Sequence, residues 1–301
     1  MDTDPLNSSA NDASAYGSTA VITFVNEKGG VAKTTSCVNL AAALAQRDCR
    51  VLCIDLDPQA NATTAFGISA DQAIQREAHC VLTMPRFPLE RAIVPTKIKN
   101  LDLVPSSARM ADCDKALVLE VGREGRLRGK LREFSRSALT DKYDVVLVDS
   151  PPSLGLLTVN ALTAATHMIV PVTTKFYALK GMALLGDLVA TLHEQIGATV
   201  NLLGVLITMF DKKTALDRTI YQLLKEKVER EYGNYMFSTI ITRSVVVSEA
   251  EAGGLPVLMR EPDSVAAGAY RALADEVAAR LASEARRPAS TSLALAGASA
   301  K

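Results

Sequence analysis

The chain has 301 residues, 48% of them hydrophobic, so it can bury the core of one large α/β domain or of two small ones. Lysine plus arginine and aspartate plus glutamate number 33 each, which excludes the overall basic excess of many nucleic-acid-binding domains, so any DNA-binding face has to be a local patch. No apolar run approaches the roughly 18 residues of a membrane span, and the acidic N-terminus lacks the apolar segment of a signal peptide.

The five cysteines contain no C-x-x-C pair, and their odd number argues against a disulfide framework. They are Cys37, Cys49, Cys53, Cys80 and Cys113. We expect them to be reduced thiols that serve as small apolar side chains in a cytoplasmic protein.

Both ends of the chain are rich in small and polar residues without hydrophobic periodicity. We expect residues 1–18 to form a disordered acidic tail and residues 286–301 to form a second disordered tail. Residues 19–285, between them, are expected to form one domain.

Short apolar runs rich in β-branched residues alternate with longer segments of helical spacing. The expected strands are 21–25, 51–56, 101–105, 144–149, 168–172 and 202–208. Continuous apolar strands separated by helices indicate an α/β fold, in which a mostly parallel, twisted sheet carries helices on both faces. Ligands of such sheets bind beyond the carboxyl ends of the strands.

Three segments have a helical pattern: 34–46, 214–231 and 264–284. The residues expected on one buried face of the second are Leu216, Ile220, Leu223 and Val228. In the third, a stripe of Tyr270, Leu273, Val277 and Leu281 is expected to pack into the core rather than to lie on a membrane.

The sequence NEKGGVAKTT, residues 26–35, indicates a phosphate-binding loop. A strand, a glycine-containing loop and a helix N-terminus present backbone N–H groups to an anion, which suits a di- or triphosphate. Lys33 would reach the β- and γ-phosphates, the Thr34 hydroxyl would bind Mg²⁺, and Thr35 would bond the α-phosphate. The loop departs from the Walker pattern G-x-x-x-x-G-K-[ST], because Glu27 and Ala32 stand where the glycines belong.

Alanine at position 32 fits such a loop if its φ is negative, or if the left-handed cost of roughly 1–2 kcal/mol is absorbed. We expect the loop to keep its shape.

Three aspartates follow strands at the same expected edge of the sheet. Asp55 and Asp57 end the second strand, and Asp149 closes the run YDVVLVD. Mg²⁺ prefers oxygen ligands and keeps several waters, so Asp149 is expected to hold it as a Walker-B residue. Asp55 and Asp57 are expected to share two roles, supporting the Mg²⁺ shell and orienting the attacking water.

These residues resemble the ParA/MinD family of P-loop ATPases, whose deviant Walker A motif reads K-G-G-x-x-K-[ST]. Further stretches are similar to the ParA-type partition branch, and the resemblance covers about residues 20–284. The stretches that are similar to this branch are CIDLDPQANAT (53–63), YDVVLVDSPPSLGLLTVNAL (143–162), IVPVTTKFYALKGMALL (169–185), GVLITMFDKKT (204–214) and SEAEAGGLPV (248–257). The resemblance implies a deviant P-loop NTPase fold and an ATPase that uses ATP and Mg²⁺.

The resemblance also implies roles for individual residues. The nucleotide would be bound by Lys28, Gly29, Gly30, Val31, Ala32, Lys33, Thr34 and Thr35. Lys28 would reach across a two-fold interface to the phosphates of a partner subunit, which couples ATP binding to dimerisation and stabilises the transferring phosphoryl group. Lys33 and Asp57 would be the other catalytic residues, and Asp57 would position the water. Thr34, Asp55 and Asp149 would hold Mg²⁺, and residues 58–63 would form a switch that senses the γ-phosphate.

By the same resemblance, the ATP-bound homodimer binds DNA without sequence preference and so lies on the nucleoid. Hydrolysis stimulated by a ParB-type centromere-binding partner would release it. One basic DNA-binding position of the family matches Lys213, whereas the other falls at Val246 and has lost its charge. Substitute charges are available at Lys212, Arg218, Lys225 and Arg243. Losing one phosphate contact should lower the salt slope by about 1, so we expect DNA binding that is weak and sensitive to salt.

Other functions of similar ATPases remain open at this point. A carboxysome- or chemotaxis-positioning ATPase would use the same chemistry on a protein cargo. A MinD-like membrane-cycling regulator needs a basic amphipathic C-terminal helix, which SLALAGASAK does not resemble. A metabolic enzyme or an iron–sulfur reductase is a third class. The first 18 residues are too short for the helix-turn-helix domain of some plasmid proteins.

Overall fold

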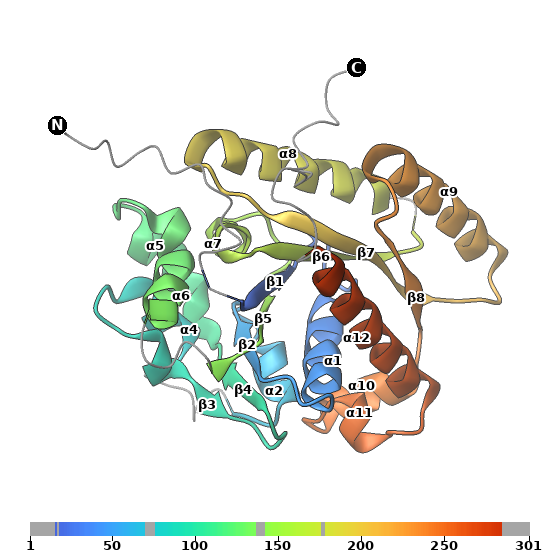
Figure 1. Cartoon of the computed structure of the whole chain (residues 1–301), viewed down its shortest axis with the longest axis horizontal. Helices are drawn as coiled ribbons and strands as arrows, with labels where there is room; N and C mark the ends of the chain where they lie inside the picture. The colour runs from blue at the N-terminus through green and yellow to red at the C-terminus, as the bar shows by residue number, and fades with distance from the viewer. Residues whose placement is uncertain (1–15, 17, 70–75, 137–141, 176–177, 285–301) are drawn as a thin grey trace.

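A computed structural model describes residues 16, 18–69, 76–136, 142–175 and 178–284 (Figure 1). Most of the expected first tail and all of the second, 286–301, lie outside the described residues. Within the first, Tyr16 is buried, and its hydroxyl donates a hydrogen bond to the Ala164 carbonyl oxygen at 2.9 Å. The packed part of the chain therefore includes Tyr16.

One sheet of eight strands organises the described residues, in the order β3-β4-β2-β5-β1-β6-β7-β8. Only β3 runs antiparallel to its neighbour within this sheet. The strands are β1 (Ala20–Phe24), β2 (Val51–Asp55), β3 (Val94–Pro95), β4 (Leu101–Val104), β5 (Val145–Asp149), β6 (His167–Thr173), β7 (Asn201–Phe210) and β8 (Met236–Thr242). The mostly parallel α/β fold is confirmed, and the six expected strands are present with slightly shifted ends.

Helices cover both faces of this sheet (Figure 1). On one face lie α1 (Lys33–Ala45), α2 (Asn61–Ala65), α10 (Val245–Ala252), α11 (Val257–Arg260) and α12 (Val265–Glu284). On the other lie α4 (Ala78–Thr83), α5 (Cys113–Leu117), α6 (Arg126–Arg136), α7 (Leu156–Ala164), α8 (Ala178–Ile196) and α9 (Ala215–Tyr232). Short 3₁₀ turns are η2 (Leu89–Ala92), η3 (Ala108–Asp112) and η4 (Arg123–Gly125). The β-strand alternation places Val145 and Leu147 against the first group, and Val146 and Val148 against the second.

The expected faces of the two long helices have different outcomes. In α12, Tyr270, Leu273 and Val277 are fully buried, which confirms the core stripe. In α9, Leu216 and Leu223 are 63% and 52% exposed, so their expected burial is wrong. The buried residues of α9 are Ile220, Leu224 and Val228, spaced four apart. Helix α9 packs on β7 and β8, at the edge of the sheet, and buries only a narrow stripe of its surface. Leu216 and Leu223 lie outside this stripe.

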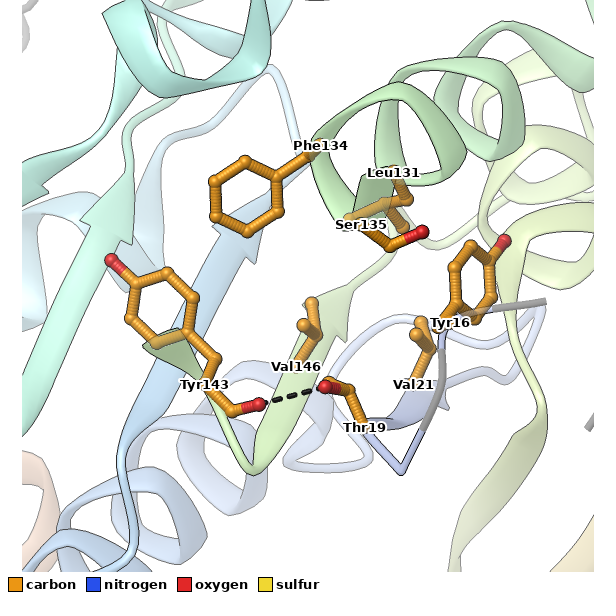
Figure 2. A pocket seen from close by; sticks show the side chains of 8 residues that line it. All are labelled: Tyr16, Thr19, Val21, Leu131, Phe134, Ser135, Tyr143 and Val146. Carbon is orange, nitrogen blue, oxygen red and sulfur yellow. Dashed lines mark hydrogen bonds between the residues drawn. The ribbon is translucent and has the colours of Figure 1, made fainter. Parts of the chain in front are cut away.

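A small cavity lies at the amino ends of β1 and β5, beneath α6 (Figure 2). It is lined by Tyr16, Thr19, Val21, Leu131, Phe134, Ser135, Tyr143 and Val146. The Thr19 hydroxyl donates to the Tyr143 carbonyl oxygen at 2.7 Å across one side of it. Its volume of about 20 Å³ suffices for roughly one water molecule, so it is too small for a nucleotide.

All five cysteines are free thiols, as expected, and Cys37 and Cys53 place their sulfur atoms 3.9 Å apart. In the described part of the chain, no helix has both the length and the apolar character needed to cross a membrane.

Candidate nucleotide site

The glycine-containing loop joins β1 to α1, at the carboxyl end of the central strands. Asn26 fixes its start, because its side-chain amide donates to the Pro171 carbonyl oxygen at 2.8 Å and its side-chain oxygen accepts the Lys28 N–H at 3.0 Å. The Thr208 hydroxyl lies within hydrogen-bond distance of the Val31 carbonyl oxygen, at 3.0 Å. The neighbouring strands β6 and β7 therefore hold the loop in place.

Two residues of the loop have left-handed backbone conformations. Gly30 has φ +69°, where glycine carries no steric cost, and Ala32 has φ 57° and ψ 36°. Ala32 precedes α1, whose first intrahelical acceptor is its own carbonyl oxygen, bonded by the Ser36 N–H at 2.9 Å. The loop thus keeps a tight turn into the helix, and alanine carries the left-handed cost.

Lys33 is the first residue of α1 and is only 6% exposed. Its ammonium donates to the Lys28 carbonyl oxygen at 3.1 Å, which folds the side chain back along the loop. Burial lowers the pKa of Lys33, while Asp149 and Asp57 oppose that change. A buried cation in a loop of backbone N–H groups is suited to bind an anion.

Asp55 and Asp149 end adjacent strands and are paired in the register of β2 and β5. Both are fully buried. Neither carboxylate oxygen of Asp149 has a hydrogen-bond partner among the described residues. Burial raises the pKa of Asp149 well above its usual value, and repulsion from Asp55 raises it further. The nearby Thr34 hydroxyl and Lys33 lower it, but by less. Two unpartnered, buried carboxylate oxygens are unfavourable unless a cation joins them.

Asp55, in contrast, is fully engaged with the segment that follows β2. One of its oxygens accepts the Asp57 N–H at 3.0 Å, and the other accepts the Thr63 N–H at 2.9 Å and the Thr63 hydroxyl at 2.7 Å. Burial raises the pKa of Asp55 to about 6, although the Thr63 hydrogen bonds oppose the rise. The Ser106 hydroxyl donates to the Asp57 carbonyl oxygen at 2.6 Å, so the loop that follows β4 also supports this segment.

Hard oxygen donors of this kind are those that Mg²⁺ prefers. The unpartnered oxygens of Asp149, with Asp55 opposite and the Thr34 hydroxyl nearby, therefore fit a Mg²⁺ ion next to the loop.

The other sequence-predicted residues lie where the loop places them. Gly29 and Gly30 are exposed, and Lys28 is half-buried. Within the described chain, the Lys28 ammonium forms no ion pair or hydrogen bond, whereas its carbonyl oxygen binds Lys33. Asp57 is 6% exposed, and its side chain accepts the Gln59 N–H at 2.9 Å.

Four of the five candidate DNA-binding residues lie together beyond the ends of β7 and β8. The Arg218 guanidinium donates to the Lys212 carbonyl oxygen at 3.0 Å, and the Arg243 N–H donates to the Phe210 carbonyl oxygen at 3.2 Å. The exposed residues Lys212, Lys213, Arg218 and Arg243 are here called the basic edge. Asp211 and Asp217 lie within it, and the Asp211 N–H donates to Asp217 at 2.9 Å, so the basic edge is only weakly positive.

The fifth candidate, Lys225, lies farther along α9 and pairs with Glu229 at 3.8 Å. Val246 is partly buried against the core face that carries α1 and α12. An apolar side chain suits that position, and the structure places no charge there.

Sequence reasoning missed several residues that shape the site. Asn26, Thr208 and Ser106 hold the loop and the segment after β2 through contacts between distant parts of the chain. Glu251 of α10 approaches Thr35, and burial raises the pKa of its carboxyl while the Thr35 hydroxyl opposes that rise. Only Asn26 carries a local signal, since it directly precedes the loop motif.

Residues 19–203 match a family described as an AAA domain. The sporulation initiation inhibitor protein Soj of Bacillus subtilis is 38% identical over 261 residues, covering 86% of this chain and 98% of Soj. The chromosome partitioning protein ParA of Myxococcus xanthus is 34% identical over 260 residues, covering 86% of this chain and 88% of that protein. This chain belongs to the ParA-type partition ATPase family.

Solved structures agree with the ParA-type fold. A protein from Mycobacterium smegmatis described as cobyrinic acid a,c-diamide synthase, with bound ATP analogue and magnesium, is 31% identical. It aligns with a TM-score of 0.73 over 91% of this chain and all of that one. A putative plasmid partition protein of Borrelia burgdorferi bound to AMPPNP shares the fold, with a TM-score of 0.69 at 22% identity over 88% of this ParA-type chain.

Proposed function

We propose that this protein is an ATP-hydrolysing switch that forms a dimer with ATP, binds DNA without sequence preference and drives DNA partition with a ParB-type partner. The observation that carries the proposal is the meeting of the buried Lys33 ammonium and the unpartnered Asp149 oxygens beside the loop. That arrangement supports binding of a Mg²⁺–nucleotide, with phosphates on the backbone of residues 28–35.

Each residue then has one task in the ATPase. Thr34 and Asp149 hold Mg²⁺, and Asp55 supports its shell while keeping Thr63 and Asp57 in place. Bound Mg²⁺ neutralises charge on the phosphates. Asp57 orients the attacking water, and residues 58–63 respond to the γ-phosphate. Hydrogen bonds of Ser106 to the Asp57 carbonyl oxygen and of Thr63 to Asp55 hold the two ends of this stretch in the structure.

The Lys28 ammonium supports the dimer. It lies at the exposed mouth of the loop without a partner in the described part of its own chain. An unpaired cation there is available to the phosphates of a second subunit, where it would stabilise the transition state. ATP would then hold the dimer together.

The basic edge supports DNA binding of modest affinity. Four cations, Lys212, Lys213, Arg218 and Arg243, stand against Asp211 and Asp217, so binding depends on few phosphate contacts and weakens with salt. Two relatives named as chromosome-partitioning proteins are 34% and 39% identical, more than the 31% of the M. smegmatis protein. This favours a ParB-type partner and a place on the nucleoid in the ATP state.

The test is retention on random-sequence duplex DNA without nucleotide and with ADP, ATP or a slowly hydrolysed analogue, at low and near-physiological salt. We expect retention with triphosphates only, weakening as salt rises. Lys213→Glu should weaken retention clearly at low salt, and the matched control Lys225→Glu, which lies on α9 and is paired with Glu229, should leave it nearly unchanged. Equal effects of both would mean that the basic edge is misplaced.

The dimer is tested separately by light scattering. Asp57→Ala with ATP should give a dimer, and Lys28→Ala with ATP should give a monomer that still binds nucleotide. If ATP is hydrolysed but DNA is never retained, the protein uses another surface, and positioning of a protein cargo becomes the better function.

A further inference from the structure

A cluster of side chains unrelated to the loop lies at the start of α4. Glu77, His79 and Cys80 each offer one ligand atom, and these atoms all lie within 4.8 Å of one another. Glu77 is the extended residue that precedes α4, and His79 and Cys80 lie in the first turn of the helix. Glu77 is fully buried, Cys80 is 1% exposed and His79 is 9% exposed.

Two polar atoms of this cluster lack partners. The Glu77 Oε2 atom and the His79 Nδ1 atom have no hydrogen bond among the described residues. The other Glu77 oxygen, Oε1, accepts a hydrogen bond from the Arg109 guanidinium at 2.7 Å. One oxygen of the carboxylate is thus held by the Arg109 cation, and the other oxygen is left without a hydrogen bond in a cluster that also contains the imidazole and the thiol.

This is the arrangement that a metal ligand shows. A ligating carboxylate is normally held by an outer hydrogen bond, as Arg109 holds Glu77, while its free oxygen binds the ion. Buried polar atoms are otherwise satisfied, so two unpartnered ones within one cluster of possible metal ligands call for an explanation.

The donor set selects the ion. Thiolate, imidazole and carboxylate are ligands of zinc, whereas Mg²⁺ takes oxygen donors and disfavours sulfur. Bonds of about 2.0–2.3 Å in a tetrahedral site separate the ligand atoms by about 3.3–3.7 Å, so small rotations of these side chains bring them to an ion. A carboxylate and a thiolate also balance the two charges of the ion.

We propose that Glu77, His79 and Cys80 form a binding site for Zn²⁺, with a fourth position left to water. Binding forms Zn–O, Zn–N and Zn–S bonds and releases the Cys80 thiol proton to solvent. The site uses none of the residues assigned to the Mg²⁺ site at the loop, and its donors include sulfur.

The site also touches the segment that follows β2. The Ala78 N–H donates to the Pro105 carbonyl oxygen at 2.8 Å. The next residue is Ser106. Its hydroxyl donates to the Asp57 carbonyl oxygen, and its N–H donates to the Thr63 hydroxyl at 2.9 Å. An ion on Glu77 therefore lies two contacts from the switch.

The test uses the full chain, stripped with a chelator and kept in excess Mg²⁺, and titrates it with Co²⁺ as a spectroscopic substitute for zinc. We expect one equivalent to bind and to produce a thiolate-to-Co²⁺ charge-transfer band, which Zn²⁺ then displaces. Cys80→Ser should abolish the band, and Cys49→Ser, which changes a cysteine outside the cluster, should keep it.

If circular dichroism shows that Cys80→Ser does not fold, a second variant tests the site. His79→Gln, at the least buried of the three ligands, should weaken Zn²⁺ binding at least tenfold in competition with a chelator and reduce the Zn²⁺-dependent rise in melting temperature. The absence of a band in the wild type, its persistence in Cys80→Ser, or its loss in Cys49→Ser would overturn the proposal.

Discussion

Replacing Ala32 by glycine tests the strain in the loop. Ala32 has φ 57°, a region that costs a non-glycine residue roughly 1–2 kcal/mol. Glycine removes that cost but loses about 0.4–1 kcal/mol through the greater freedom of the unfolded chain. The net gain in the free energy of unfolding is then about 0.8 kcal/mol, or roughly 2–3 °C in melting temperature for a domain of this size.

The predicted effect on ATP affinity is small. If Ala32 has the same left-handed conformation with and without nucleotide, the strain is present in both states and cancels in the dissociation constant. We expect Ala32→Gly to change the ATP dissociation constant by less than about threefold, since a tenfold change corresponds to about 1.4 kcal/mol.

The assay pairs thermal denaturation with nucleotide titration. Gly30→Ala is the matched control for stability, because it adds a methyl group at φ +69° with no atom within 4 Å of it, and it should lower the melting temperature. If Ala32→Gly tightened ATP binding more than tenfold, the loop would have different conformations in the free and the bound protein, and the strain at Ala32 would not cancel. A melting temperature that did not rise would refute the strain itself.

Three further predictions concern stability. Gly204→Ala places a methyl group 2.5 Å from the Phe237 ring, so it should lower the free energy of unfolding by about 1–3 kcal/mol in urea denaturation, and an unchanged midpoint would contradict the packing. Asn39→Leu removes the acceptor of the first N–H of α11, which bonds the Asn39 side-chain oxygen at 2.8 Å. The free energy of unfolding should fall by about 1–3 kcal/mol in the same assay, because a buried donor is left unsatisfied. A smaller fall would show that water replaces the amide. The Arg50 guanidinium, hydrogen-bonded to Asp144, lowers the pKa of that carboxyl. Because the pair is half exposed, Arg50→Gln should cost at most about 1 kcal/mol at neutral pH. That difference should vanish as the pH falls through the lowered pKa of Asp144, because protonation removes the charge, and a difference that persisted in acid would argue against the pairing.

Local patterns predicted the parts of the site that lie within a few residues of one another. The loop is contiguous, and Asp55 and Asp149 were identifiable because each closes an apolar strand, a feature visible in sequence. The parallel register then brings them together without further information. The φ of Ala32 was not predictable, since the motif allowed either sign.

Contacts between distant segments were outside the reach of these patterns. The bonds of Thr208 to the loop and of Ser106 to Asp57 depend on the order of strands in the sheet, which periodicity does not specify. Strand β8 was missed because its sequence MFSTIIT mixes polar with apolar residues at the edge of the sheet. The exposed Leu223 of α9 shows the same limit, because the width of a buried helical stripe depends on what the helix covers.

The strand order also constrains how the protein can be made. Strand β5 lies between β2 and β1, and the other neighbour of β1 is β6, so both neighbours of β1 come late in the chain. As the chain leaves the ribosome, β1 and its loop therefore emerge more than a hundred residues before the first strand that can pair with them. Asp149 arrives with that same strand. A nascent chain shorter than about half the protein thus carries the complete loop motif but no folded nucleotide site, and nucleotide binding begins only after β5 has been synthesised.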